Sequence, residues 1–160
     1  MQRIKKLMAI SPITLSIAGT AFICNNFELF VPKPYKDSGG LWTIGYGSRI
    51  TDAQVQQFKD GITEAQAQAM YQGYMQALGV KLRQCPLAGL SQNQNDAIFS
   101  LAYNIGYQAF LDSTIYKQLM CRGIDLSSWL LFIHDQRGNV DQGLIRRRQM
   151  ELKLFIWAIY

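Results

Sequence analysis

Residues 27–47 read Phe-Glu-Leu-Phe-Val-Pro-Lys-Pro-Tyr-Lys-Asp-Ser-Gly-Gly-Leu-Trp-Thr-Ile-Gly-Tyr-Gly, and this stretch decides the fold of the chain. An apolar run leads into Glu28, which predicts that Glu28 stands at the end of a helix. Pro32 and Pro34 each lack a backbone donor and restrict the residue before them. We therefore expect the helix that carries Glu28 to stop by Phe30.

The second half of the stretch predicts a turn followed by a strand. Ser38, Gly39 and Gly40 follow Asp37 and form a turn signal, because glycine adopts positive φ without strain. Residues 41–46 are rich in β-branched and aromatic side chains, which favours a strand. The sequence thus predicts a corner from helix to hairpin, with a small sheet packed beside helices.

This corner brings polar groups of three kinds toward one cleft. Glu28 is an acid, Asp37 is a second carboxylate, and Thr43 supplies a hydroxyl from the strand. Such a set suits general acid and base catalysis on a neutral polymer such as a polysaccharide. The carboxylate spacing by itself is weak support, since Glu28 and Asp37 also have structural interpretations as a helix-end acid and a turn former.

Composition limits the class of protein. The chain has 160 residues, about one domain, and 49% of them are hydrophobic while only 17% are charged. The formal net charge of +5 and the pI near 9.2 favour an anionic partner: nucleic acid, a membrane surface or an acidic cell-wall polymer. The sequence has no helix-turn-helix signature or stacked-aromatic motif, so we do not expect nucleic-acid binding.

Cysteine and histidine usage argues against a metal site or a disulfide scaffold. Cys24, Cys85 and Cys121 are too few and too scattered for a disulfide framework, and they form no Cys-x-x-Cys pair. His134 is the single histidine, and we interpret it as a surface or structural residue. We expect no metal and no cofactor.

The N-terminal segment, residues 1–24, allows three interpretations. Arg3, Lys5 and Lys6 precede an uncharged run, residues 7–24, which polar residues and Pro12 dilute. The run is either a cleaved signal peptide, a buried first helix, or an uncleaved anchor that enters the membrane and later leaves it. Cleavage near Ala21 would leave Glu28 only a short helical stub, so we rank it last. We favour the weak anchor, because the basic cluster lies where the positive-inside rule keeps it cytoplasmic.

The rest of the chain is predicted to be helical. Capping-box spacing marks three helix starts, at Thr51 with Gln54, Thr63 with Gln66, and Ser91 with Gln94. After the helix that starts at Thr51, five further helices are expected, at residues 62–83, 94–105, 114–122, 126–134 and 144–160. We expect a small lobe around residues 25–60 and a larger helical lobe after it, with a substrate cleft between them.

Periodicity predicts the buried face of three of these helices. For residues 62–83 the face is Ala69, Met70, Tyr74, Ala77 and Leu78; for residues 94–105 it is Ala97, Ile98, Leu101, Ala102 and Ile105; for residues 144–160 it is Ile145, Leu152, Phe155, Ile156 and Ile159.

The joint spacing of these features resembles the phage-type lysozymes, the endolysins of glycoside hydrolase family 24. The motif Tyr35-x-Asp-x-x-Gly-x-x-Thr-Ile-Gly-Tyr-Gly47 carries the most specific part of the resemblance. Glu28 before it, and Ser113-Thr114 and Gly143-Leu-Ile-Arg-Arg-Arg-x-x-Glu151 after it, extend the resemblance over most of the chain, residues 27–151. The resemblance implies an α+β, mainly helical two-lobe fold with a small antiparallel sheet in the first lobe, and a lysozyme-like catalytic domain over residues 25–160.

The resemblance also implies roles. Glu28 matches the catalytic glutamate that protonates the glycosidic oxygen, Asp37 the second carboxylate, and Thr43 the hydroxyl that helps place the attacking water. Tyr103 and Asn104 resemble the segment that lines the cleft from the opposite lobe, and Arg147 or Arg148 the arginine that pairs with the glutamate. The expected substrate-binding residues are Tyr46, Tyr103, Asn104, Arg147 and Arg148.

The implied reaction is hydrolysis of peptidoglycan between N-acetylmuramic acid and N-acetylglucosamine, with inversion, by a monomer that lyses the host cell. The uncharged run 7–24 resembles a signal-anchor-release segment, which implies the host inner membrane and then the periplasm. Without such an anchor, the enzyme is expected in the host cytoplasm before lysis. In the periplasm, Cys24 is hypothesised to pair with Cys85 or Cys121.

Two departures from the family pattern keep a rival interpretation open. Leu29 stands where the family usually has glycine, and Ser48 where it usually has histidine. The alternative is a catalytically inactive protein that binds peptidoglycan or the membrane and keeps only the fold. The presence of Glu28, Asp37 and Thr43 together argues against it.

Overall fold

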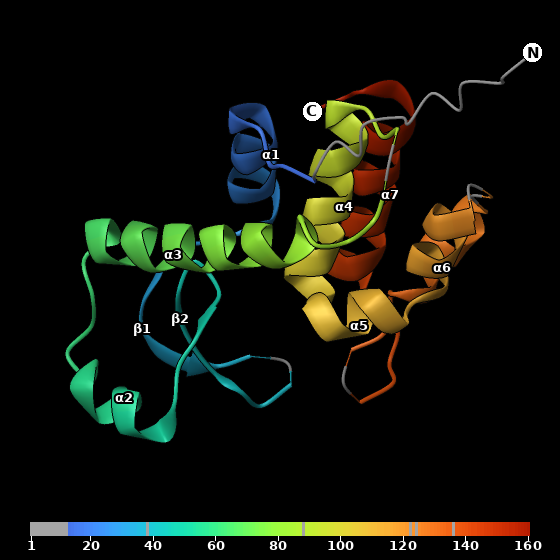
Figure 1. The fold of residues 1–160 in the computed structure, drawn as a ribbon. Coiled ribbons are helices and arrows are strands. Elements are labelled where there is room, and N and C mark those ends of the chain that lie inside the picture. The colour runs from blue at the N-terminus through green and yellow to red at the C-terminus, as the bar shows by residue number, and fades with distance from the viewer. Residues whose placement is uncertain (1–12, 38, 88, 122, 124, 136) are drawn as a thin grey trace, which may run out of the picture.

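The computed structural model describes residues 13–37, 39–87, 89–121, 123, 125–135 and 137–160. The elements are α1 (Ile17–Phe27), β1 (Val31–Lys36), β2 (Trp42–Gly45), β3 (Ser48–Arg49), α2 (Asp52–Gln57), α3 (Glu64–Leu82), α4 (Gln92–Ile105), α5 (Tyr107–Asp112), α6 (Thr114–Cys121), the 3₁₀ helix η1 (Leu126–Leu131) and α7 (Gln142–Trp157). Figure 1 shows α3 running between the small sheet and the bundle that contains α4 and α7. The predicted fold class, mainly α with a small antiparallel sheet, is confirmed.

The sheet has three antiparallel strands in the order β1-β2-β3. The predicted strand is confirmed as β2, within residues 41–46. The strand β1 was not predicted, because Pro32 and Pro34 indicate a broken helix rather than a strand. Both prolines are tolerated because β1 is an edge strand, and its register shifts between Val31 and Tyr35.

The helix α3 joins two hydrophobic clusters. Its N-terminal part contributes Ala67 to a small cluster with Ile44, Ile50 and Ile62 under the sheet. Its C-terminal part contributes Tyr71 and other side chains to the large core around α4. We call β1–β3 and α2 the sheet lobe of the molecule, and α1, α4–α7 and η1 its helical lobe. The helix α3 contacts both lobes.

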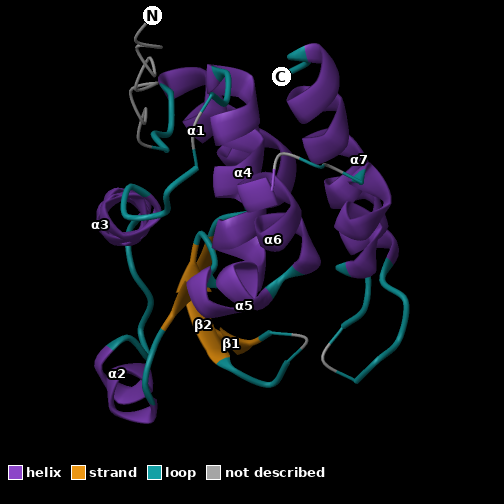
Figure 2. Cartoon of the chain, turned by 45° about the vertical axis from the view of Figure 1, so that its right-hand side comes forward, coloured by secondary structure: helices purple, strands orange, loops and turns teal. Residues whose placement is uncertain are grey.

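The core of the helical lobe is built on α4 and α7, which lie side by side in both views (Figures 1 and 2). The predicted face of α4 is largely confirmed, since Ala97, Ile98, Leu101 and Ala102 are all buried. Trp129 of η1 packs against Phe155 of α7, with ring centroids 5.3 Å apart. The helix α7 is thus held by α4 and by η1, and this packing sets the position of the side chains that α7 turns toward the sheet lobe.

The remaining predicted helices are confirmed with shifted ends, and the segment 126–134 forms a 3₁₀ helix only as far as Leu131. Thr51 and Thr63 form the predicted capping boxes with Gln54 and Gln66. At the third predicted capping box, the Ser91 backbone N–H donates to Gln94 Oε1 at 3.0 Å. The short helix α5 was not predicted.

Two predicted faces are wrong. The buried face of α3 consists of Ala67, Tyr71, Met75, Leu78, Gly79 and Leu82 instead, so that of the predicted residues only Leu78 is fully buried. The helix α7 buries Arg147, Arg148, Glu151, Leu154 and Phe155, whereas Ile156 and Ile159 are exposed. The cause in α7 is a buried ion-pair cluster, which apolar periodicity does not detect.

The described part of the N-terminal run packs on the helical lobe. Ile13 is fully buried, and α1 buries Gly19, Phe22 and Ile23. Ile17 on the outer face of α1 is 91% exposed. Residues 7–12 of the run lie outside the described residues. Within the described ranges, no helix is both long enough and apolar enough to span a membrane.

Cys24, Cys85 and Cys121 all carry free thiols. The hypothesised disulfide from Cys24 to Cys85 or Cys121 is therefore not formed in this structure.

Candidate active site

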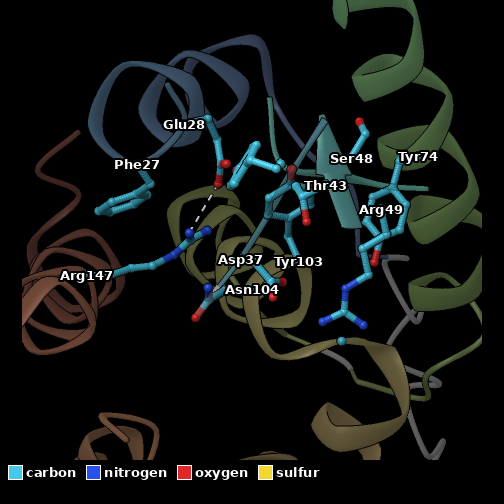
Figure 3. Close-up of a pocket in the computed structure, with 13 residues that line it drawn as sticks. Phe27, Glu28, Asp37, Thr43, Ser48, Arg49, Tyr74, Tyr103, Asn104 and Arg147 are labelled. Carbon is cyan, nitrogen blue, oxygen red and sulfur yellow. Dashed lines mark hydrogen bonds and ion pairs between the residues drawn. The ribbon is translucent and has the colours of Figure 1, made fainter. Parts of the chain in front are cut away.

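A cavity of ≈ 430 Å³ lies between the two lobes. Its lining comes from the end of α1, the sheet, α3, α4 and α7: Phe27, Glu28, Tyr35, Asp37, Thr43, Gly47, Ser48, Arg49, Tyr74, Tyr103, Asn104, Gly106 and Arg147. Figure 3 shows these side chains around the cavity, with Glu28 and Arg147 joined by a dashed line. Elements far apart in sequence thus meet at one place.

Glu28 is the residue that caps the C-terminus of α1. Its backbone is extended, with φ −112 and ψ 117, because the chain leaves the helix here to enter β1. Its backbone N–H still donates to the Cys24 carbonyl oxygen at 3.4 Å. The Glu28 side chain is only 10% exposed. The predicted helix end therefore presents a nearly buried carboxylate to the cavity.

The partner of Glu28 is Arg147. Arg147 Nη1 lies 3.2 Å from Glu28 Oε1, and the guanidinium stacks on Phe27 with its centre 4.5 Å from the ring centroid. Burial raises the pKa of Glu28, while the charge and hydrogen bond of Arg147 lower it; burial is the larger effect. Glu28 therefore keeps its proton to a higher pH than an ordinary glutamate does.

Asp37 closes the turn after β1. Its Oδ1 accepts hydrogen bonds from the backbone N–H of Gly39 at 2.9 Å and of Leu41 at 2.8 Å. Among the described residues, its Oδ2 has no hydrogen-bond donor. One oxygen thus holds the loop and the other stays available on the cavity side.

Thr43 lies in the middle strand, paired with Tyr35 of β1. It is 3% exposed, and its Oγ1 donates to the Leu41 carbonyl oxygen at 3.2 Å. A donor fixed in this way leaves the lone pairs of Oγ1 free to accept a hydrogen bond from a molecule in the cavity.

The wall from α4 is formed by Tyr103 and Asn104. The Tyr103 hydroxyl donates to the backbone carbonyl oxygen of Tyr46 at 2.9 Å and so links the helical lobe to the hairpin. Asn104 Oδ1 accepts from Arg148 Nη2 at 3.0 Å, which leaves the Asn104 amide NH₂ as a donor.

The cavity brings together six of the eight predicted site residues: Glu28, Asp37, Thr43, Tyr103, Asn104 and Arg147. Arg147, and not Arg148, is the arginine that pairs with Glu28.

The other two predicted site residues, Tyr46 and Arg148, lie outside this cavity. Tyr46 borders a second cavity, and its hydroxyl donates to Glu64 Oε1 at 2.6 Å. Arg148 is 0% exposed, so the expectation that it contacts substrate is wrong. A buried guanidinium needs a local counter-charge, and here Glu151 supplies it.

Two cavity residues were missed. Tyr74 was expected in the core but is 47% exposed and packs edge-on to Tyr103, with centroids 5.4 Å apart. Periodicity gave no signal for it, because Met70, Ala77 and Leu78 stand at helical spacing from Tyr74 and make its face look like a core face. Arg49 of β3 lines the cavity too, and no motif pointed to it. In the described part of the chain, no group of three or more His, Cys, Asp or Glu is placed to hold a metal ion.

Comparison with known families places most of the chain in a described family. A family model described as Phage lysozyme matches residues 25–151. The endolysin of Acyrthosiphon pisum secondary endosymbiont phage 1 is 34% identical over 128 residues, which cover 77% of this chain and 85% of that protein. The endolysin of Bacillus phage PZA is 32% identical over 148 residues, which cover 88% of this chain but only 54% of that longer protein.

A third relative and a solved structure extend this likeness. The SAR-endolysin of Enterobacteria phage P21 is 24% identical over 130 residues, which cover 78% of this chain and 74% of that protein. The solved structure of the endolysin from Escherichia coli O157:H7 phage FAHEc1 superposes with a TM-score of 0.76 at 27% identity, covering 94% of this chain and 98% of that one. The similarity thus includes both the sequence and the fold.

Proposed function

Since the chain belongs to the phage lysozyme family, we propose that Glu28 is the general acid with which it cuts peptidoglycan. The chain is an endolysin, a glycoside hydrolase of the lysozyme (muramidase) type whose substrate is peptidoglycan. The bond to be cut is the one between N-acetylmuramic acid and N-acetylglucosamine.

The observation that carries this role is the environment of Glu28. A general acid must hold a proton at the working pH, and burial raises the pKa of Glu28 in that direction. The ion pair with Arg147 at 3.2 Å fixes the orientation of the carboxyl group and stabilises the carboxylate left after proton transfer. Both properties support transfer of the Glu28 proton to the glycosidic oxygen.

Asp37 and Thr43 are proposed to activate and place the water. The Asp37 Oδ2 has no donor among the described residues, and the Thr43 hydroxyl is fixed by the Leu41 carbonyl. A water held between them is deprotonated by Asp37 as it attacks the anomeric carbon. Attack from the side opposite Glu28 gives inversion, provided that the gap between the carboxylates admits the water.

Tyr103 and Asn104 are proposed to bind the glycan from the helical lobe. Tyr103 presents an aromatic ring to the cavity, and the Asn104 NH₂ is a donor for sugar hydroxyl or acetamido oxygens. Tyr46 contributes through its backbone, because its carbonyl oxygen holds the Tyr103 hydroxyl at 2.9 Å. We expect the enzyme to act as a monomer, which sedimentation equilibrium tests.

The test is clearance of permeabilised Gram-negative cells, measured as loss of turbidity. We expect Glu28→Gln to stay folded but to lose activity by about 10²–10⁴-fold, the usual contribution of a general acid. Ser48→Ala is the matched control, because Ser48 lines the same cavity without an assigned role. Wall binding without clearance by the wild-type protein would instead support the inactive alternative.

We also propose that residues 7–24 take the enzyme to the host inner membrane before its release into the periplasm. The support is the basic cluster of Arg3, Lys5 and Lys6 ahead of an uncharged run, together with the similarity to the SAR-endolysin of phage P21. Release from the membrane would then allow α1 to dock on the helical lobe and bring Glu28 to the cavity.

Ile17→Lys tests this route without harming the folded enzyme. Ile17 is 91% exposed, so a lysine there leaves the packing of α1 unchanged. In the membrane the same charge costs about 2.5–3.5 kcal/mol. We expect the purified variant to keep its activity while the chain in cells shifts from the membrane fraction to the cytosol. An unchanged distribution would show that the run is not an anchor.

A further inference from the structure

Glu151 is a carboxylate inside the helical lobe with no access to solvent. It is 0% exposed, in a core that includes Trp129 and Phe155. A buried carboxylate is costly unless charge and hydrogen bonds compensate it. On α7, Glu151 follows Arg147 by four residues and Arg148 by three, so helix geometry places all three side chains on one face.

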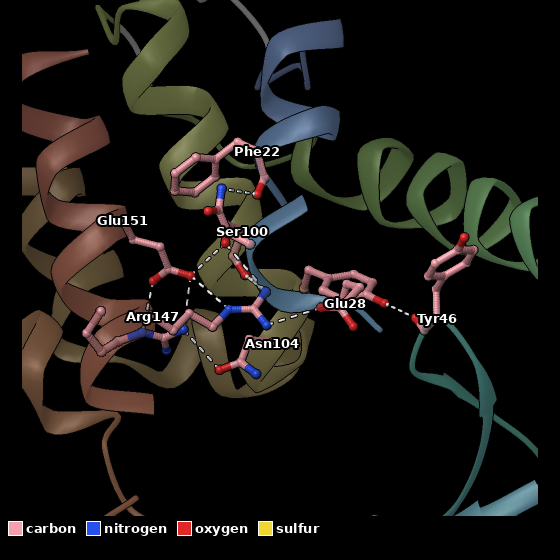
Figure 4. Close-up of polar contacts among 10 residues, drawn as sticks. Phe22, Glu28, Tyr46, Ser100, Asn104, Arg147 and Glu151 are labelled. Carbon is pink, nitrogen blue, oxygen red and sulfur yellow. Dashed lines mark hydrogen bonds and ion pairs between the residues drawn. The ribbon is translucent and has the colours of Figure 1, made fainter. Parts of the chain in front are cut away.

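Both carboxylate oxygens of Glu151 are saturated. Oε1 accepts from Ser100 Oγ at 2.6 Å, from Arg147 Nε at 3.2 Å and from Arg148 Nη2 at 3.0 Å. Oε2 accepts from Trp129 Nε1 at 3.0 Å and lies 2.9 Å from Arg148 Nε. Figure 4 shows the contacts that lead from Glu151 through Arg147 to Glu28. Glu151 is therefore the centre of the cluster.

The contacts of Arg147 determine where its free edge points. Its Nε is held by Glu151, and its Nη2 donates to the Ser100 carbonyl oxygen at 3.3 Å. Because the guanidinium is planar and rigid, fixing these two nitrogens fixes the third. That third nitrogen, Nη1, is the one that lies 3.2 Å from Glu28 Oε1.

The charges of the cluster balance only after Glu28 has given up its proton. Arg147 and Arg148 bring two positive charges, Glu151 brings one negative charge, and the Glu28 carboxylate supplies the second negative charge once its proton is transferred. Arg147 lies at the same distance, 3.2 Å, from an oxygen of each glutamate. Without the negative charge of Glu151, Glu28 would be the one carboxyl group left in this cluster. The positive charges of both arginines would then act on Glu28.

We propose that Glu151 is a positioning residue of the reaction: it holds Arg147 against Glu28 and takes up the excess positive charge that Arg147 and Arg148 carry. The proposal rests on the assigned role of Glu28 as general acid. Glu151 itself stays out of contact with substrate, because it is completely buried.

Other titratable groups around Glu28 do not replace this effect. Tyr35 of β1, Tyr71 of α3 and Tyr103 of α4 face it, and burial raises the pKa of each, so all three stay neutral. Asp37 and Arg49 line the same cavity but lie in the sheet lobe, outside the contacts of Glu151. Substitutions at Glu151 therefore act on Glu28 through Arg147 and Arg148, and not through these other groups.

The experiment is the pH dependence of kcat/KM for Glu151→Gln, which keeps the shape and removes the charge. A surplus positive charge makes Glu28 lose its proton more readily. We expect the alkaline limb of the profile to move down by about one pH unit, and kcat to fall more than KM rises. A limb that stays in place, in a folded variant with lower activity, would reduce Glu151 to a structural role and overturn the proposal.

Two further variants keep the test decisive if Glu151→Gln is unstable. Arg148→Gln removes one positive charge, so the limb is expected to move up in pH. The double variant Arg148→Gln/Glu151→Gln restores the balance, so its limb is expected near that of the wild type. Shifts in the same direction for both single variants, or a double variant that behaves like Glu151→Gln, would contradict the charge argument.

Titration of Glu28 by carbon-detected NMR separates this proposal from the assigned function. It reports the protonation of Glu28 without any turnover. If the wild type proved inactive on peptidoglycan, the function would fail, while a lower titration midpoint of Glu28 in Glu151→Gln would still support the positioning role. An unchanged midpoint would overturn it.

Discussion

Gly47 and Glu28 approach each other so closely that a β-carbon on Gly47 would lie 2.9 Å from Glu28 Oε2. Gly47 follows β2 in the hairpin and has a φ of +76. The hairpin backbone thus forms one side of the space that Glu28 occupies, and the side chain of Arg147 forms another. Glu28 is positioned from both lobes at once.

Gly47→Ala is therefore expected to damage activity more than stability. The positive φ costs about 1–2 kcal/mol in the free energy of unfolding. Displacement of Glu28 by the new methyl group is expected to lower kcat by about 10²-fold, as small misplacements of reacting groups do. Gly138→Ala is the control, because its φ is +80 but nothing lies within 4 Å of its added β-carbon. Full activity in Gly47→Ala would contradict the contact.

The raised pKa of Glu28 makes a second prediction, for stability. The native state binds the Glu28 proton more tightly than the unfolded chain, whose glutamate has the ordinary pKa of 4.5. The unfolded state therefore loses its proton first, and the contribution of Glu28 to stability, fully present below pH 4.5, is lost as pH rises through the folded-state pKa.

Urea unfolding of the wild type and Glu28→Gln over a pH series measures this contribution. The glutamine does not titrate, so the free energy of unfolding of the wild type is expected to fall relative to that of the variant as pH rises above 4.5. A constant difference between the two proteins would mean that the folded-state pKa of Glu28 is not raised.

Asp37 is predicted to have separable structural and chemical roles. Asp37→Asn retains an oxygen for the Gly39 and Leu41 amides, so its stability is expected to stay within about 0.5 kcal/mol of wild type. Its activity is expected to fall by about 10²-fold or more, since an amide cannot accept the water proton. Asp37→Ala is expected to lose about 1–2 kcal/mol in addition. Equal activity of Asp37→Asn and wild type would exclude Asp37 as the base.

The sheet-lobe half of the site could be predicted from the sequence because local rules determine it. Pro32 and Pro34 end the helix after Glu28, and the turn chemistry after Asp37 places the strand that carries Thr43. These signals act over a few residues, so they are visible without the fold. The edge strand β1 was still missed, because the same prolines that end a helix also argue against a strand.

The helical-lobe half depends on contacts between distant residues. Arg147 and Arg148 are adjacent and chemically alike, yet only the packing of α7 against α4 turns Arg147 to Glu28 and Arg148 into the core. Glu151 belongs to the same buried cluster, and a helix with such a cluster has no clear apolar stripe. Periodicity therefore predicted the wrong face for α7, and the choice between the arginines required the structure.

The docking of α1 is predicted to depend on the absence of a side chain at Gly19. A β-carbon there would lie 2.6 Å from Asp96 Oδ1. Asp96 is fully buried and accepts from the Ser16 backbone N–H at 2.8 Å and from the Tyr160 hydroxyl at 2.7 Å. It therefore cannot move away without breaking bonds to both ends of the described chain.

Gly19→Ala and Gly73→Ala are a matched pair that tests this contact. Both glycines lie inside helices, where alanine is normally favoured by up to about 1 kcal/mol. Nothing lies within 4 Å of a β-carbon on Gly73, so Gly73→Ala is expected to raise Tm by about 2–4 °C with unchanged activity. Gly19→Ala is expected to lose about 1–3 kcal/mol instead, because α1 must shift away from Asp96. Its activity is expected to fall too, since Glu28 caps the same helix. A rise in Tm for both variants would show that α1 does not rest on Asp96 in solution.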